Sequence, residues 1–240
     1  MRKDSVPDES ACMPDARAVR GMFGRISGRY DFLNHFLSLG IDRSWRRALA
    51  VEVRTGPSGL VLDLAAGTLD VALAVQERLP GTGVLAMDFC LPMLERGLAK
   101  TGSRPIWPVA ADATMLPLAR NSVDCLTMAF GIRNIRPRGP AFAEMLRVLA
   151  PGGRACILEF GSGRDRIWGG LYNVYLDRIL PLLGRLLSRD AAYAYLASSI
   201  DGFPRAVELE DEMREAGFAR VRHQRLTGGI VCLHTGEKPL

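Results

Sequence analysis

From residue 59 onward, short apolar runs alternate with longer amphipathic stretches, and this alternation limits the chain to few folds. The apolar runs end in Asp or Gly, as buried strands often do. Strands are therefore expected at 59–64, 83–88, 106–110, 123–130 and 154–160, and helices at 70–79, 91–100 and 139–149. Because strands joined by a crossover helix run parallel, the sequence predicts an α/β fold with a mostly parallel sheet covered on both faces.

Three segments stand outside this alternation. Near the end, 218–227 and 230–236 read as strands joined by Gly228-Gly229, which predicts an antiparallel hairpin. Before the sheet, 16–54 is helical in its apolar spacing; Gly40 interrupts it, and Asp42 is expected to cap a helix over 43–54. The apolar segment 165–203 is expected to form a helical insertion over the carboxyl edge of the sheet.

The 240 residues, 48% of them hydrophobic and 24% charged, predict one globular domain. We expect this domain to span 16–240, with helical cap segments at 16–54 and 165–203, after a flexible N-terminus at 1–15. That N-terminus lacks the apolar stretch of a signal peptide, and no run of 18 apolar residues occurs.

Cysteine usage and charge bear on compartment and partners. The five cysteines, at 12, 90, 125, 156 and 232, show no metal-pair spacing, so we expect a reduced, cytoplasmic protein without a metal site. The net charge is +5, with eight arginines against four acids between 11 and 54. This excess reflects either the coding genome or contact with anionic lipid headgroups. No nucleic acid is expected, because aromatic residues do not interleave with the charges.

The segment VLDLAAGTLD, 61–70, carries the first candidate site. An apolar strand leads into Asp63, then a loop of small residues that includes Gly67 and Thr68, then a helix. Small residues allow a ligand to approach the backbone, and a helix N-terminus offers amides to an electronegative group. The alternative interpretation is a tight turn that binds nothing.

Polar residues also follow the next two strands. Asp88 ends the strand 83–88, where an acid can accept hydrogen bonds from both hydroxyls of a ribose. Asp112 and Ala113 follow the strand after it, where a carboxylate can accept from an adenine amino group. Helix capping is the alternative for Asp88. Together the three strand ends predict a nucleoside site, and the missing G-x-G-x-x-G loop argues against a dinucleotide.

These segments resemble the class I methyltransferases, and more narrowly the menaquinone/ubiquinone C-methyltransferases. The resemblance covers residues 16–238 and rests on VRGMFGRISGRYDFLN (19–34), SLGIDRSW (38–45), FGIRN (130–134), YLASSIDGFP (195–204) and LTGGIVCLHTG (226–236). It implies a Rossmann-like class I methyltransferase fold with seven strands, the last one antiparallel, and S-adenosylmethionine as cofactor. It also implies a polyprenyl hydroquinone substrate. The cofactor contacts would be Asp63, Gly67, Thr68, Asp88, Asp112 and Ala113.

The same resemblance suggests catalytic residues. Arg133 would stabilise the oxyanion of a deprotonated hydroquinone, or else form an ordinary salt bridge. Tyr30 would close over the ring, and Asp31 would act as a base or merely hydrogen bond at a helix end. Asn134 would orient its neighbours. The rival interpretations are a protein that binds S-adenosylmethionine without catalysis and a methyltransferase for another phenolic molecule.

Two positions depart from the family pattern. Leu69 stands where relatives usually have glycine; it either crowds the cofactor or lies in an ordinary first helical turn and points into the core, which we favour. Ala129 stands where relatives can have serine. Residues 171–187, with apolar and arginine side chains, are the expected contact with the membrane surface, unless this helix only covers the sheet. A homodimer is left open.

Overall fold

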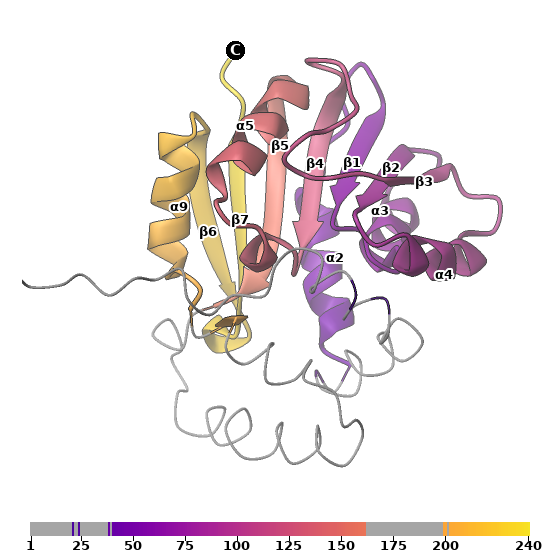
Figure 1. Cartoon of the computed structure of the whole chain (residues 1–240), viewed down its shortest axis with the longest axis horizontal. Helices are drawn as coiled ribbons and strands as arrows, with labels where there is room; N and C mark the ends of the chain where they lie inside the picture. The colour runs from indigo at the N-terminus through magenta and orange to yellow at the C-terminus, as the bar shows by residue number, and fades with distance from the viewer. Residues whose placement is uncertain (1–20, 22–23, 25–37, 39, 162–198, 201) are drawn as a thin grey trace, which may run out of the picture.

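The computed structural model describes residues 21, 24, 38, 40–161, 199–200 and 202–240 (Figure 1). The predictions for Tyr30, Asp31, most of 16–37 and the segment 165–198, including 171–187, lie outside the described residues. Within the described part, no helix is both long and apolar enough to cross a membrane.

The described residues form a seven-stranded sheet in the order β3-β2-β1-β4-β5-β7-β6. The strands are β1 (Leu60–Leu64), β2 (Gly83–Asp88), β3 (Ile106–Ala110), β4 (Val123–Ala129), β5 (Leu149–Phe160), β6 (Ala219–Leu226) and β7 (Val231–Glu237). The pairs among β1 to β5 are parallel, and β7 is antiparallel to both β5 and β6. The predicted fold class, including the antiparallel last strand, is therefore confirmed.

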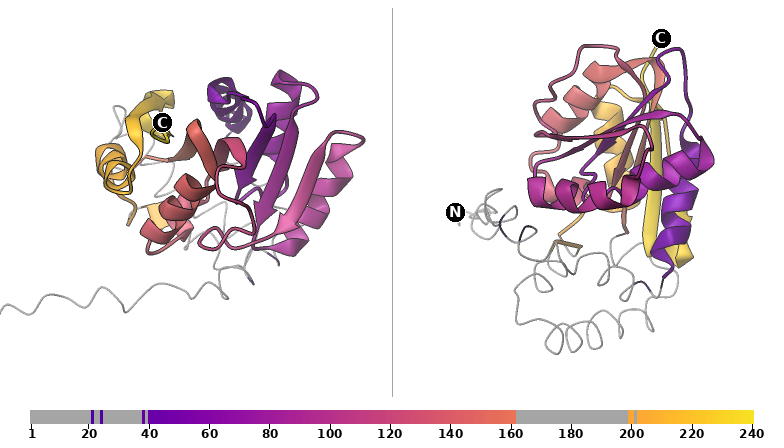
Figure 2. Two further views of the ribbon diagram at one scale, coloured as in Figure 1. Left: turned by 90° about the horizontal axis from the view of Figure 1, so that it is seen from above. Right: turned by 90° about the vertical axis from the view of Figure 1, so that its right-hand side faces the viewer.

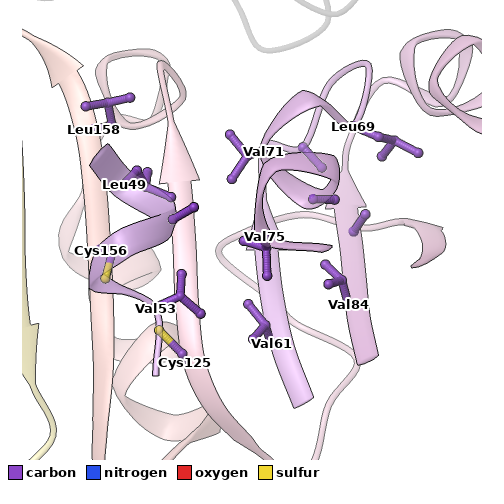
Figure 3. Packing of buried hydrophobic residues seen from close by; sticks show 14 of the residues in the cluster. Leu49, Val53, Val61, Leu69, Val71, Val75, Val84, Cys125, Cys156 and Leu158 are labelled. Carbon is purple, nitrogen blue, oxygen red and sulfur yellow. The ribbon is translucent and has the colours of Figure 1, made fainter. Parts of the chain in front are cut away.

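Helices cover both faces of this sheet (Figure 2). On one face, α2 (Asp42–Glu52), α3 (Asp70–Arg78) and α4 (Leu91–Thr101) pack on one set of alternating strand residues, part of which Figure 3 shows. On the other face, α5 (Gly139–Val148) and α9 (Ala206–Glu215) pack on the intervening set. Successive strand residues point to opposite faces, so Val61 and Leu62 belong to different clusters. This double burial explains why the central strands β1 and β4 are largely apolar, whereas the edge strand β6 is polar and partly exposed.

Three details of the predicted elements are wrong. Asp42 does not cap the second helix: it is the first residue of α2, where its carboxylate accepts a hydrogen bond from Ser38 and pairs with Arg46. Strand β5 begins at Leu149 rather than 154, because Leu149 still pairs with Val123. Helix α9 was not predicted, since its apolar Ala206, Leu209 and Met213 lie within a run dominated by charge.

The described cysteines are all buried. Cys125 and Cys156 lie on neighbouring strands in the cluster beneath α2, and Cys232 is 1% exposed on β7. Their predicted role as small core residues is confirmed.

Candidate active site

The loop between β1 and α3 has an unusual backbone. Ala65, Gly67 and Leu69 all have positive φ angles, of 52°, 52° and 68°. Left-handed conformations are rare for residues with a side chain and cluster at binding sites. Hydrogen bonds hold the loop in place, because the N–H of Ala66 donates to the carbonyl of Met87 at 3.1 Å. The loop therefore lies directly against the end of β2.

Asp88, at the end of β2, secures this loop. One carboxylate oxygen accepts the N–H of Gly67 at 2.8 Å and the other accepts the N–H of Cys90 at 2.8 Å. Burial raises the pKa of Asp88, and these N–H groups offset only part of that rise. A carboxylate has about four lone-pair sites, so some acceptor capacity is left for a ligand.

Asp63, at the end of β1, is fully buried. Its Oδ1 accepts a hydrogen bond from Thr127 Oγ1 at 2.7 Å, whereas Oδ2 is buried with no hydrogen-bond partner among the described residues. Burial raises its pKa to about 7, against the lowering effects of Thr127 and of the Ala72 N–H in the first turn of α3. A buried carboxyl group with an unused oxygen is a candidate for binding rather than for stability.

The end of β3 lies next to the end of β2 at the same edge of the sheet. The N–H of Ala111 donates to the carbonyl of Asp88 at 3.0 Å, which places Asp112 and Ala113 beside Asp88. The Asp112 side chain is exposed and accepts hydrogen bonds from the N–H and hydroxyl of Thr114. The six residues expected to contact a nucleoside therefore lie along one hydrogen-bonded edge of the sheet.

Leu69 combines features of both sequence interpretations. Its backbone is left-handed and it precedes α3 as the N-cap, so the expected ordinary helical turn is wrong. Its side chain is fully buried in the core, as we favoured, and lies against Gly97 of α4. A Cβ on Gly97 would lie 2.4 Å from Leu69 Cγ and 2.8 Å from the Thr68 carbonyl. Gly97 thus makes the space that Leu69 fills in the core between the loop and α4.

Arg133 and Asn134 lie in a short 3-10 helix, Ile132–Asn134, after β4. The Arg133 guanidinium is buried and pairs with Glu159 of β5 at 2.7 Å, and the same nitrogen donates to the Phe130 carbonyl at 2.6 Å. Its Nε is buried without a hydrogen-bond partner among the described residues. The salt bridge that we considered is therefore present, and it does not occupy all donors. Asn134 is half-buried at the end of this turn.

Glu159 is the site residue that sequence reasoning missed. It is fully buried on β5 and neutralises Arg133. The available signal was an acid inside the apolar run RACILEF, because unpaired acids are rarely buried.

The comparisons with known proteins identify the family. The model of the ubiE/COQ5 methyltransferase family matches residues 11–238. The chain belongs to this family. A ubiquinone/menaquinone biosynthesis C-methyltransferase UbiE from Syntrophotalea carbinolica is 42% identical, and the match covers 92% of this chain and 94% of that protein. A demethylmenaquinone methyltransferase from Mycobacterium marinum is 43% identical over 94% and 95% of the two chains.

A solved SAM-dependent methyltransferase from Thermotoga maritima has the same fold. It superposes with a TM-score of 0.65 at 18% identity, covering 91% of this chain and 98% of that one. The expected family, fold and enzyme class are confirmed: the ubiE/COQ5 protein described here is a methyltransferase. Its cofactor is S-adenosylmethionine.

The loop and strand ends of this ubiE/COQ5 member fit that cofactor. A carboxylate that keeps acceptor capacity suits ribose hydroxyls, and the left-handed backbone of the loop before the N-terminus of α3 suits a carboxylate group. Ala129, the last residue of β4, supplies no polar side chain there.

Proposed function

We propose that this protein transfers a methyl group from S-adenosylmethionine to a ring carbon of a polyprenyl hydroquinone in quinone biosynthesis. Family membership across nearly the whole chain carries the proposal, because relatives bearing both menaquinone and ubiquinone names match it. The substrate is demethylmenaquinol or the corresponding benzoquinol of the ubiquinone pathway.

When bound, S-adenosylmethionine supplies an electrophilic methyl group. In this proposal Asp88 accepts hydrogen bonds from the ribose hydroxyls through its unused lone pairs, and Asp112 and Ala113 contact the adenine. Gly67 and Thr68 bind the amino acid portion through their backbone, and Asp63 lies behind them. These contacts fix the donor at the carboxyl edge of β1 and β2, and such positioning accounts for much of the rate of group transfer.

The acceptor carbon becomes nucleophilic when a ring hydroxyl loses its proton. Arg133 stabilises the resulting phenolate through its planar guanidinium group, which can bond an oxyanion. Glu159 fixes the orientation of that guanidinium through their ion pair at 2.7 Å. Asn134 orients its neighbours, Tyr30 closes over the ring, and Asp31 accepts the ring proton directly or through water.

The membrane holds the prenyl tail of such a substrate, so we also propose a cytoplasmic enzyme with peripheral membrane contact. Residues 171–187 are the proposed contact. Arginine side chains near an anionic surface contribute about 1 kcal/mol each, and the binding is therefore expected to weaken with salt.

Incubation with labelled S-adenosylmethionine tests the proposed reaction. We expect label in the product from demethylmenaquinol or from the benzoquinol, and the preferred acceptor identifies the pathway. A folded protein that binds S-adenosylmethionine but labels neither hydroquinone would refute the reaction and leave a binding protein.

Arg133→Lys tests the catalytic assignment. Lysine retains the charge opposite Glu159 but lacks the planar fork, so turnover is expected to fall roughly tenfold or more while cofactor affinity stays near normal. The cofactor affinity is measured by calorimetry and the turnover by label transfer. Unchanged turnover would remove Arg133 from the mechanism.

A further inference from the structure

Three aromatic rings from distant parts of the chain meet at the carboxyl edge of the sheet. Phe130 follows β4, Phe160 ends β5, and Trp45 comes from α2. The centroids of Phe130 and Phe160 are 4.8 Å apart, and the Trp45 ring lies 6.2 Å from the first and 6.5 Å from the second. Trp45 is buried, whereas both phenylalanines are half-buried. The two phenylalanines are therefore less buried than the tryptophan that they contact.

The backbone of Phe130 is held in a conformation that phenylalanine rarely adopts. Its φ is +57°, in the left-handed region. Two contacts hold it there: its N–H donates to the Leu158 carbonyl at 2.8 Å, and its carbonyl accepts from Arg133 at 2.6 Å. Bulky residues in this region mark sites where the surrounding structure imposes a particular side-chain direction.

This aromatic surface adjoins the cofactor loop. Gly131, next to Phe130, packs so closely on the loop that a Cβ on it would lie 2.4 Å from the Ala65 Cβ. The Arg133 guanidinium lies 5.4 Å from the centroid of the Phe160 ring. On the other side, Trp45 Nε1 donates to Thr227 Oγ1 at 2.7 Å, which fixes the tryptophan to the hairpin. Ring surface, cationic group and cofactor loop are thus contiguous.

We propose that Phe130 and Phe160 form an aromatic platform that binds the acceptor ring of the hydroquinone beside the cofactor loop. This inference rests on the proposed function and names the residues that recognise its substrate. Aromatic rings stack in offset or edge-to-face arrangements, so the platform selects a planar aromatic acceptor. Arg133, at the edge of the platform, then lies near the hydroquinone oxygen that carries negative charge.

Quenching of tryptophan fluorescence by 1,4-naphthoquinone tests the platform without requiring turnover. The quinone is a tail-free, oxidised stand-in for the acceptor ring. If it binds on the platform, it lies next to Trp45, and saturable quenching is expected in the full chain and is expected to be largely lost in Trp45→Phe. Phe130→Leu and Phe160→Leu should raise the quinone concentration at half-quenching roughly fivefold to tenfold. Phe130→Tyr keeps the aromatic ring, so its quinone concentration at half-quenching should stay near the wild-type value.

Phe218→Leu is the matched control. Phe218 pairs edge-on with Phe142 at 6.2 Å on the opposite face of the sheet, so its loss weakens the core without touching the platform. The Phe218→Leu protein should lose stability but keep quinone affinity. All variants are also assayed for S-adenosylmethionine affinity by calorimetry, which should stay within about twofold.

The outcomes separate the platform from its alternatives. Phe130→Leu and Phe160→Leu proteins that lose only thermal stability, like the control, would make these rings core filling and overturn the proposal. A loss of S-adenosylmethionine affinity with unchanged quinone binding would assign the rings to the cofactor instead. Specific quenching in a protein that labels no hydroquinone would support the platform while refuting the proposed reaction.

Discussion

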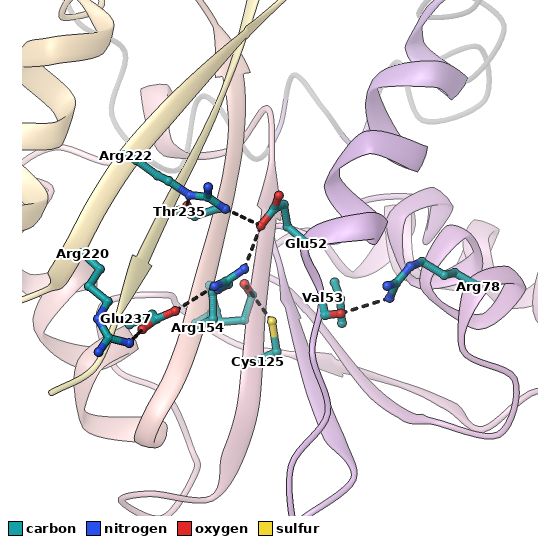
Figure 4. Close-up of polar contacts among 10 residues, drawn as sticks. Glu52, Val53, Arg78, Cys125, Arg154, Arg220, Arg222, Thr235 and Glu237 are labelled. Atoms are coloured by element: carbon teal, nitrogen blue, oxygen red, sulfur yellow. Dashed lines mark hydrogen bonds and ion pairs between the residues drawn. The ribbon is translucent and has the colours of Figure 1, made fainter. Parts of the chain in front are cut away.

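At the amino edge of the sheet, Arg154 lies between two carboxylates, Glu52 and Glu237, each 2.7 Å away (Figure 4). At the carboxyl edge, Asp63 and Asp88 are buried with no described arginine or lysine within ion-pair distance. The hydrogen bond from Arg154 lowers the pKa of Glu237, whereas burial raises the pKa of both aspartates.

This difference between the two edges distinguishes charged groups that stabilise the fold from those expected to serve function. Glu52 lies on α2, Arg154 on β5 and Glu237 on β7, so the network connects a covering helix to the sheet. Arg220 and Arg222 extend it over β6. Buried charges that only stabilise a fold need partners, and unpaired ones are costly. The unpaired aspartates at the other edge are therefore expected to affect cofactor binding and pH dependence more than they stabilise the fold.

The largest expected effect is that of Asp63 on the pH dependence of stability. Its pKa is about 7 in the folded protein and near 3.8 in the unfolded chain, so the folded state binds more protons between these values. The stabilisation is complete below pH 3.8 and is lost as pH rises through 7, by about 4 kcal/mol in total. Asp63→Asn should lack this decline when unfolding free energies are compared from pH 5 to pH 8.

Asp124→Asn is the control for that experiment. Asp124 is at the amino edge, where burial acts to raise its pKa but hydrogen bonds from Gly56 and Ser58 lower it overall. Its contribution is present above its unfolded pKa and is lost only in acid. The Asp124→Asn protein should therefore keep the wild-type slope between pH 5 and pH 8. A wild-type slope in Asp63→Asn as well would refute the raised pKa of Asp63.

Arg154→Met should cost about 3 kcal/mol of unfolding free energy, because it leaves two partly buried carboxylates without their shared partner. Cofactor affinity should not change, since Arg154 lies at the edge away from the loop. Denaturant unfolding and calorimetry measure the two quantities. A folded variant that binds S-adenosylmethionine poorly would show that the amino edge also affects cofactor binding and would refute this prediction.

Asp88→Ala should weaken S-adenosylmethionine binding by tenfold or more. Hydrogen bonds to a charged group contribute roughly 1.5–3 kcal/mol, and the change also releases the N–H of Gly67 from its acceptor. Calorimetry on the folded variant measures the affinity. An affinity equal to that of the wild type would remove Asp88 from the cofactor site.

Leu69→Gly should give the smallest effect. Glycine relieves the left-handed backbone, but the buried leucine side chain leaves a cavity against Gly97, so a net loss of about 1 to 2 kcal/mol is expected. Cofactor affinity should not improve, because the side chain points into the core. Tighter binding of S-adenosylmethionine would show that Leu69 crowds the site.

The local sequence pattern is sufficient to predict the fold and the residues along one edge of the candidate site. Strands and helices are recognisable from their period, and the carboxyl ends of parallel strands necessarily meet at one edge. Asp63, Asp88 and Asp112 can thus be grouped from the sequence alone. Helix α9 escapes such a prediction because its three buried apolar residues lie in a run dominated by charge.

The tertiary structure determines the burial, the pairing and the pKa of each of these residues. Arg133 and Glu159 are 26 residues apart, and nothing local shows that β4 and β5 bring them together. The side-chain position of Leu69 depends on Gly97 of α4, and the aromatic cluster of Trp45, Phe130 and Phe160 depends on α2, β4 and β5 meeting. Period and strand order follow from the backbone geometry of neighbouring residues. Burial and pairing, and the pKa values that depend on them, arise only when residues distant in the chain exclude water from one another.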